Sequence, residues 1–187
     1  MNNRIAIFVD GPSFLCMQKD GLGWFVDPQK IITWAKRRFD GEIVDTRYYD
    51  SIGFEINKDQ DEKRKKERQE KLEKFHYVLP QLGYSVHKKN VKNVFSATDS
   101  WVEDDVIISM MLDIWESKDK FDTLILVSGD GDFEEVVERL RSKRVIVLAT
   151  DSHLSHSLRA KVGQRYIDFN NIQVDVKKDT QKNDQSR

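Results

Sequence analysis

Short apolar runs alternate along the chain with longer stretches whose apolar residues recur at helical spacing. The segments Ile5 to Val9, Thr123 to Val127 and Val145 to Ala149 are short and almost wholly apolar, which is typical of strands buried on both faces of a parallel sheet. Between such segments, apolar residues spaced three and four apart predict helices, for example over residues 102–115. The alternation predicts an α/β fold with a mostly parallel sheet.

We predict five strands and helices on both faces of the sheet, which makes three layers. The strands are residues 5–9, 42–49, 84–87, 123–127 and 145–149. The first and fourth strands run into aspartate-glycine segments, and in doubly wound sheets the functional crevice lies beyond the carboxyl ends of the strands. If both segments reach that crevice, these two strands are neighbours, and the strand order is 3-2-1-4-5. Residues 90–100 are expected to form a loop.

The polar C-terminal segment of the chain sets the expected end of the domain. One domain is expected over residues 1–172, and the polar residues 173–187 are expected to form a disordered tail. Residues 58–82 form a long, densely charged stretch, and its first half, residues 58–71, has no apolar stripe, which predicts a solvated helix or a mobile arm. This arm could pair with a second copy of the chain, so a homo-oligomer is left open.

Composition narrows the class of protein. The chain has 187 residues, which is enough for one domain with its own core, and its 31 basic and 32 acidic residues give no overall basic field of the kind that marks many nucleic-acid-binding proteins. Cys16 is the single cysteine, so an intramolecular disulfide is excluded, which fits a reducing compartment. No segment approaches the roughly 18 apolar residues of a membrane helix. We therefore expect a cytoplasmic protein that does not enter a membrane.

Four aspartates are the candidate chemical groups: Asp10, Asp105, Asp130 and Asp132. Carboxylates gathered in one crevice repel one another unless protons or cations neutralise them. A divalent ion such as Mg²⁺ or Mn²⁺ prefers these oxygen ligands, and phosphodiester hydrolysis is a reaction it commonly serves. Each aspartate also has a structural alternative, as a turn residue, a helix cap or a favourable charge in the first turn of a helix.

Other sites are less well supported by the sequence. The four histidines do not have zinc-site spacing with Cys16, and there is neither a Walker A motif nor an EF-hand loop. His153 and His156 could approach a substrate phosphate, although a surface role is expected for them. A phosphatase of the haloacid-dehalogenase type would need a second aspartate two residues after Asp10, where Pro12 stands.

The segments FVDGPS, TRYYDS, EDDV and VSGDGDF, followed by SHSLRAKVGQRYIDF, resemble the NYN family of PIN-like nucleases, which includes the LabA-like (DUF88) proteins. The resemblance covers residues 4 to 170. It implies a PIN-like Rossmannoid fold and Mg²⁺- or Mn²⁺-dependent cleavage of RNA. The acids that match the catalytic and metal-binding positions of the family are Asp10, Asp105, Asp130 and Asp132.

Substrate contacts are expected around these acids, with single-stranded RNA as the substrate. Ser13 and Ser128 could orient water or phosphate, Trp101 could stack on a base, and cationic side chains could guide the strand. Arg159 and Lys161 are among the cationic side chains expected to guide the RNA strand. The chain departs from the family where Val102-Glu103-Asp104 replaces a Lys-Gly segment. A catalytically weak or inactive module that binds RNA or protein is therefore the alternative function.

Overall fold

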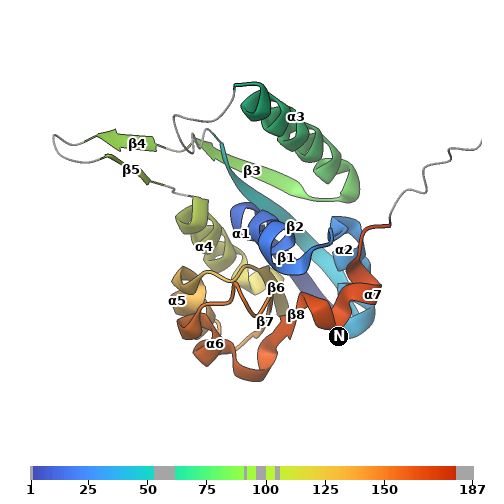
Figure 1. Ribbon diagram of the computed structural model, residues 1–187. Coiled ribbons are helices and arrows are strands. Elements are labelled where there is room, and N and C mark those ends of the chain that lie inside the picture. Colours follow the sequence, from blue (N-terminus) through green and yellow to red (C-terminus); the bar gives the residue numbers. More distant parts are fainter. Residues whose placement is uncertain (1, 53–61, 91, 96–99, 104–105, 180–187) are drawn as a thin grey trace, which may run out of the picture.

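The computed structural model describes residues 2–52, 62–90, 92–95, 100–103 and 106–179. Its main sheet has six strands, all paired in parallel, in the order β3-β2-β1-β6-β7-β8 (Figure 1). The strands are β1 (Asn3–Asp10), β2 (Gly41–Ile52), β3 (Ser85–Asn90), β6 (Thr123–Val127), β7 (Arg144–Ala149) and β8 (Tyr166–Asp168).

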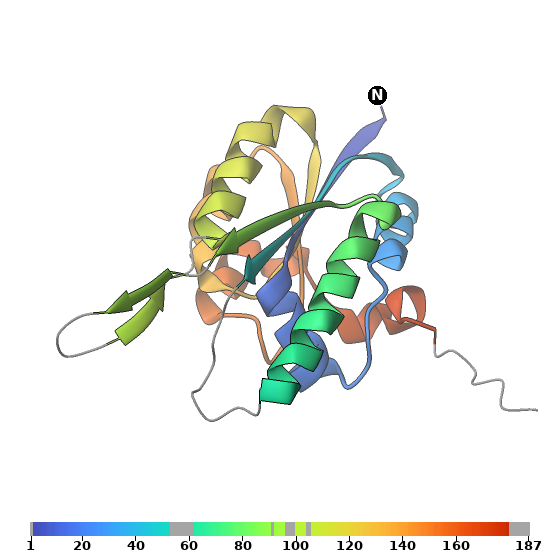
Figure 2. The same cartoon turned by 90° about the horizontal axis from the view of Figure 1, so that it is seen from above.

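The predicted strand order 3-2-1-4-5 is confirmed, with β6 and β7 as the fourth and fifth strands. The predicted number of strands was wrong, because β8 adds a sixth strand beside β7. The expected loop over residues 90–100 is also corrected. It contains the strand β4 (Lys92–Phe95), which pairs in antiparallel fashion with β5 (Ser100–Glu103) to form a hairpin outside the main sheet (Figure 2).

Helices cover both faces of the sheet (Figures 1 and 2). One face carries α1 (Gly11–Cys16), α2 (Pro28–Phe39), α3 (Glu62–Val78) and α7 (Gln173–Val176), and the other carries α4 (Val106–Ser117), α5 (Glu134–Arg139) and α6 (His156–Val162). Short helical turns of 3₁₀ or π type complete the fold: η1 (Met17–Leu22), η2 (Leu79–Leu82), η3 (Lys118–Lys120), η4 (Gly131–Phe133), η5 (Gly163–Arg165) and η6 (Phe169–Ile172).

Helix α2 shows how the sequence sets an element. The Asp27 side chain accepts a hydrogen bond from the Gln29 backbone nitrogen at 2.9 Å, and Pro28 supplies a backbone angle suited to the first turn. Trp34 is among the residues that the helix buries against the sheet. Asp40 ends the helix in the left-handed conformation, with φ of 44°. The capping residues and the apolar face of α2 therefore indicate the same start and end for this helix.

The core lies on both faces of the central strands. Residues 5–9 of β1 and 124–127 of β6 are buried along their whole length. Such strands have no solvent face, which is why their sequences are continuously apolar rather than alternating. Their carboxyl ends open at one edge of the sheet, and this edge carries the candidate site.

The fold continues beyond the expected limit at residue 172. Helix α7 packs against α2, Val176 is buried, and the Asp27 backbone nitrogen donates a hydrogen bond to the Val176 carbonyl at 2.8 Å. The Lys178 backbone nitrogen donates to the Phe25 carbonyl at 2.8 Å. The expected tail boundary at residue 173 was therefore wrong, because residues 173–178 form part of the domain. The last residues, 180–187, lie outside the described part of the chain, as do residues 58–61 at the start of the predicted charged arm.

Within the described ranges, no helix combines the length and apolar character needed to cross a membrane.

Candidate functional site

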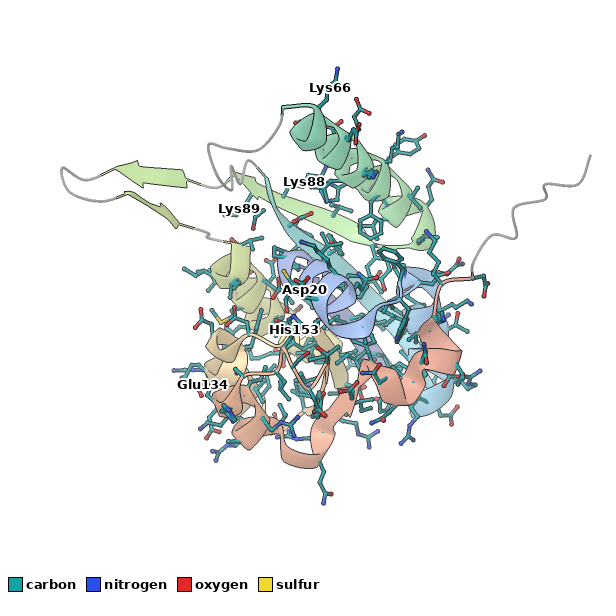
Figure 3. The ribbon with its side chains drawn as sticks, in the orientation of Figure 1. Asp20, Lys66, Lys88, Lys89, Glu134 and His153 are labelled. Atoms are coloured by element: carbon teal, nitrogen blue, oxygen red, sulfur yellow. The ribbon has the colours of Figure 1, made fainter. Side chains whose placement is uncertain are left out.

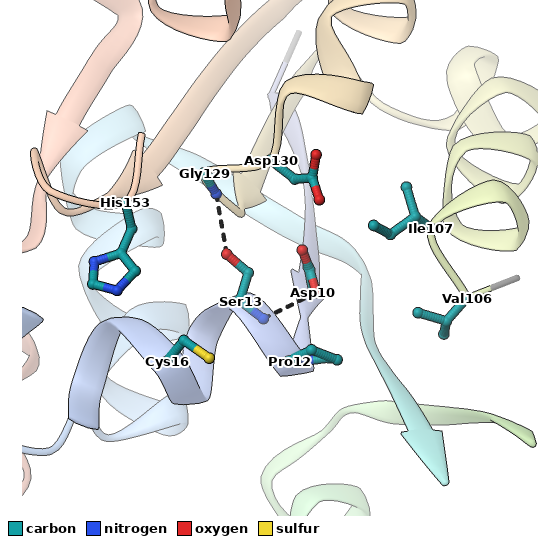
Figure 4. Close-up of a pocket in the computed structure, with 9 residues that line it drawn as sticks. All are labelled: Asp10, Pro12, Ser13, Cys16, Val106, Ile107, Gly129, Asp130 and His153. Carbon is teal, nitrogen blue, oxygen red and sulfur yellow. Dashed lines mark hydrogen bonds between the residues drawn. The ribbon is translucent and has the colours of Figure 1, made fainter. Parts of the chain in front are cut away.

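Two of the predicted acids meet at the carboxyl edge of the sheet. Strands β1 and β6 are neighbours, with Val9 opposite Val127, so both strands end at the same level. Asp10 is the last residue of β1, and Asp130 follows the end of β6 by three residues. Both line a cavity of about 290 Å³ (Figure 4). Its lining residues are Asp10, Pro12, Ser13, Cys16, Val106, Ile107, Gly129, Asp130 and His153.

Asp10 is held in place by hydrogen bonds to both of its carboxylate oxygens. Oδ1 accepts from the Ser13 backbone nitrogen at 3.2 Å, and Oδ2 accepts from the Ser128 hydroxyl at 2.6 Å. The side chain is 3% exposed. Asp10 therefore caps α1, and it also faces the cavity. A carboxylate oxygen has two lone pairs and can accept a hydrogen bond while it coordinates a cation.

Ser128 connects the two loops that carry the acids. Its hydroxyl donates to Asp10 Oδ2 and accepts from the Asp130 backbone nitrogen at 3.1 Å. The residue is completely buried and does not line the cavity. The expected contact between Ser128 and substrate is therefore corrected, because this side chain positions Asp10 from behind. Ser13 does line the cavity, and its hydroxyl accepts from the Gly129 backbone nitrogen at 3.2 Å.

Asp130 and Asp132, which flank Gly131 in the sequence, occupy different environments. Asp130 lines the cavity, and its Oδ1 accepts a hydrogen bond from the Asp132 backbone nitrogen at 3.0 Å, which caps η4. The Asp132 side chain is exposed and is not among the residues that line the cavity. The fourth predicted acid, Asp105, lies outside the described residues.

The described acids fit a magnesium-type ion better than a fully protein-coordinated metal. In the ranges that the structure describes, no group of three or more histidine, cysteine, aspartate or glutamate side chains is arranged to hold a metal. Mg²⁺, however, is usually bound by one or two carboxylates together with water and substrate phosphates. Asp10 and Asp130 would be the two carboxylates of such a site, with the Ser13 hydroxyl as a neighbouring hard oxygen donor.

Comparison with known protein families matches residues 4–179 to the NYN domain. The chain belongs to the NYN domain family. This confirms the resemblance seen in the sequence, and the family as a whole consists of PIN-like nucleases. The low amplitude and bright protein LabA of Synechococcus elongatus is 31% identical over 182 residues, which cover 94% of this chain and 89% of LabA.

The fold of this NYN domain also occurs in a solved structure. A crystal structure of a protein of unknown function from Vibrio parahaemolyticus aligns with a TM-score of 0.65 and 24% sequence identity. The alignment covers 95% of this chain and 97% of the Vibrio chain. The two proteins therefore share the α/β fold.

Two of the predicted strand-guiding cations of the NYN domain, Arg159 and Lys161, are held near acidic side chains. Arg159 forms an ion pair with Asp151, and its guanidinium carbon lies 5.0 Å from the centre of the Tyr166 ring. Lys161 Nζ lies 3.4 Å from Glu138 Oε2. Neither Arg159 nor Lys161 lines the cavity. Trp101 belongs to β5, and its side chain is outside the described part of the structure.

His153 is a residue of the cavity wall that the sequence did not place at the site. A surface role was expected for it, yet it lines the same cavity as Asp10 and Asp130 (Figure 4). His153 follows the carboxyl end of β7, the strand next to β6. The rule that ligands bind beyond the carboxyl ends of parallel strands applies to that loop as well. Applied to all neighbouring strands, this rule would have identified His153.

Gly129 permits a backbone contact that shapes the cavity. A Cβ atom at this position would lie 1.9 Å from the His153 carbonyl oxygen and 2.7 Å from its carbonyl carbon. The Ser155 backbone nitrogen donates to the Gly129 carbonyl at 2.9 Å, which joins the same two loops. An added methyl group must therefore push backbone atoms apart.

We expect Gly129→Ala to lower the free energy of unfolding by about 1–3 kcal/mol or more, the usual cost of overpacking. Denaturant unfolding monitored by tryptophan fluorescence measures the change. The matched control is Gly131→Ala, where the added Cβ would meet the Ser157 hydroxyl at 2.9 Å, a side-chain atom that can move. Equal stability losses in the two variants would contradict the backbone clash.

Proposed function

We propose that this NYN domain is a metal-dependent ribonuclease that hydrolyses phosphodiester bonds of single-stranded RNA, with Mg²⁺ or Mn²⁺ as its cofactor. The observation that carries the proposal is the convergence of Asp10 and Asp130, from neighbouring parallel strands, on one cavity. Membership of a family of PIN-like nucleases supports the same reaction class.

Four residues would share the work of the proposed reaction: Asp10, Asp130, Ser13 and Ser128. Asp10 and Asp130 would hold the ion. The Ser128 hydroxyl and the Ser13 backbone nitrogen fix the Asp10 carboxylate, so little reorganisation is needed when substrate arrives. When bound, the ion supplies Lewis-acid activation of the attacking water and neutralises charge on the phosphate. The Ser13 hydroxyl is placed in the cavity to donate a hydrogen bond to water or phosphate.

A single strand suits this site because its flexible backbone can enter a recess between loops. Lys88 and Lys89 lie on β3 (Figure 3), and we expect the backbone of the bound RNA strand to pass close to them. In the sheet register Asp10 lies opposite Tyr49, while Lys88 and Lys89 lie opposite Asp50 and Ser51. The two lysines are therefore at the same edge of the sheet as Asp10, two strands away, which is roughly 10 Å. Their exposed ammonium groups would attract the phosphate backbone.

The proposal is tested by incubating labelled single-stranded RNA with Mn²⁺, Mg²⁺ or chelator. Cleavage is expected with either metal and should be lost with chelator. Asp130→Asn should reduce cleavage by at least about 100-fold, because one of the two cavity carboxylates loses its charge. Asparagine is as good a helix cap as aspartate, so the fold should persist. Metal-independent cleavage, or an Asp130→Asn variant with wild-type activity, would overturn the proposal.

A second candidate is a catalytically weak module that binds RNA or protein partners. It is favoured by the exposure of Asp132, which leaves two described carboxylates on the cavity wall. Calorimetric titration with Mn²⁺ distinguishes the two functions. Saturable binding that Asp130→Asn weakens supports the nuclease, whereas RNA binding without any metal binding supports the module.

A further inference from the structure

The cavity wall presents an electrostatic problem for a phosphate. Two of its residues, Asp10 and Asp130, carry carboxylates, and the described residues that line it include no lysine or arginine. A phosphodiester brought against these acids is repelled unless hydrogen-bond donors compensate. Apart from the Ser13 hydroxyl and the Cys16 thiol, the polar side chain on this wall that can donate is His153 (Figure 4).

The His153 ring is held at its Nδ1 atom. Its Nδ1 atom lies 2.9 Å from the Thr150 hydroxyl and 2.9 Å from the Ser152 hydroxyl. Gly21 lies against the same part of the ring, because a Cβ added there would come within 3.1 Å of ring atoms Cε1 and Nδ1 and 3.0 Å of the Thr150 hydroxyl. A ring fixed in this way loses little conformational entropy when it binds a ligand, which is the usual property of a preorganised contact.

The second ring nitrogen remains available. Among the described residues, His153 Nε2 has no hydrogen-bond partner, and the ring is only partly buried. Hydroxyl groups can donate to Nδ1, and the neutral tautomer that they then favour carries its proton on Nε2. His153 can therefore offer its Nε2–H group as a donor to a ligand in the cavity.

We propose that His153 is a substrate-binding residue whose Nε2–H donates a hydrogen bond to a phosphate oxygen of the RNA strand. The inference rests on the proposed function, and it assigns the phosphate contact within that site. A hydrogen-bond donor held by Thr150 and Ser152 suits this position, since a lysine or arginine among the acids would form ion pairs with them and compete with the cation. Arg159 and Lys161 are engaged in such pairs with Asp151 and Glu138.

The decisive variant is His153→Ala, compared with wild type in steady-state cleavage of labelled single-stranded RNA. Loss of a hydrogen bond to a charged group is expected to raise KM by about 10- to 100-fold, with a much smaller change in kcat. Calorimetric binding of Mn²⁺ should be unchanged, because the imidazole is not a ligand of the ion. His153→Gln, whose amide can also donate, should recover part of the loss.

His156→Ala is the matched control, because His156 is an exposed histidine three residues further along and does not line the cavity. It should behave as wild type. A second variant, Gly21→Ala, tests the ring position without removing the imidazole. Its added methyl group should displace the ring and raise KM in the same direction as His153→Ala.

Equilibrium binding of the same RNA, followed by fluorescence anisotropy, separates the two proposals. A wild-type protein that binds RNA more tightly than His153→Ala but cleaves none would overturn the nuclease and support the phosphate contact. Cleavage by wild type with an unchanged KM and affinity in His153→Ala would overturn the role of His153 alone. Loss of Mn²⁺ binding in His153→Ala would also overturn it, and a protein that neither binds nor cleaves RNA would overturn both.

Discussion

Asp10→Asn is expected to abolish metal-dependent RNA cleavage, with a loss of about 10³-fold or more in kcat. Removal of one of two cavity carboxylates takes away several kcal/mol of interaction with the cation and with the charge that it stabilises, and each 1.4 kcal/mol is a factor of ten in rate. The effect should exceed that of Asp130→Asn, because Asp10 is more deeply buried and its carboxylate is fixed by hydrogen bonds to both oxygens.

The fold of Asp10→Asn should be preserved. The asparagine side-chain oxygen can still cap α1, and the new amide group can donate to the second lone pair of the Ser128 hydroxyl oxygen, whose first lone pair accepts from the Asp130 backbone nitrogen. Initial rates with Mn²⁺ and thermal unfolding are the two measurements. The control is Asp119→Asn in η3, where the aspartate side chain is 86% exposed. Full activity in Asp10→Asn, or an equal loss in Asp119→Asn, would contradict the assignment.

The strand order could be predicted because burial and chemistry agreed. Continuous apolar runs marked β1 and β6 as central strands, and the aspartates after both runs required the strands to be neighbours. Strand β8 and the hairpin of β4 and β5 were missed because strands of three or four residues are too short to show a period. Helix α7 was missed for a similar reason, since its four residues contribute a single buried side chain, Val176.

The site was only partly readable for a different reason. Asp10 and Asp130 follow strands, so topology alone directs them to the crevice. The roles of Ser128 and His153 depend on which way a loop side chain turns, and no spacing rule encodes that direction. Arg159 was predicted from its charge and motif position, but charge does not reveal the nearby Asp151 that pairs with it. The acids of a site are thus easier to find from sequence than the groups that surround them.

A buried acid–base pair joins α3 to β2 away from the cavity wall, and we expect its loss to have a large effect on stability. His76 Nε2 lies 2.6 Å from Asp50 Oδ2, and each side chain is 4% exposed. We expect His76→Leu to lower the free energy of unfolding at neutral pH by about 3–5 kcal/mol, because it leaves the Asp50 carboxylate buried without its main partner. Denaturant unfolding measures the loss, and His156→Leu, at an exposed histidine, is the control with a near-zero change.

A double variant tests whether the pair is the cause. In Asp50→Leu/His76→Leu no buried charge is left alone, so the loss should be clearly smaller than the sum of the two single losses. Additive losses would indicate that the two side chains contribute through independent packing. The remaining hydrogen bond to Asp50, from the Ser51 backbone nitrogen at 2.8 Å, is present in His76→Leu and absent when Asp50 is replaced by leucine.

The pH dependence of the His76→Leu loss distinguishes a charge effect from a packing effect. Burial raises the pKa of Asp50 above its ordinary value of 3.8, while the hydrogen bond and charge of His76 lower it in part. A folded-state pKa above the unfolded one means that the stability contributed by this group is complete below pH 3.8 and falls as pH rises through the folded pKa.

Without His76 the Asp50 pKa rises further, and this decline in stability extends to higher pH. The difference in stability between wild type and His76→Leu should therefore be small near pH 4 and increase toward pH 7, whereas a difference that is constant with pH would show that His76 acts by packing alone.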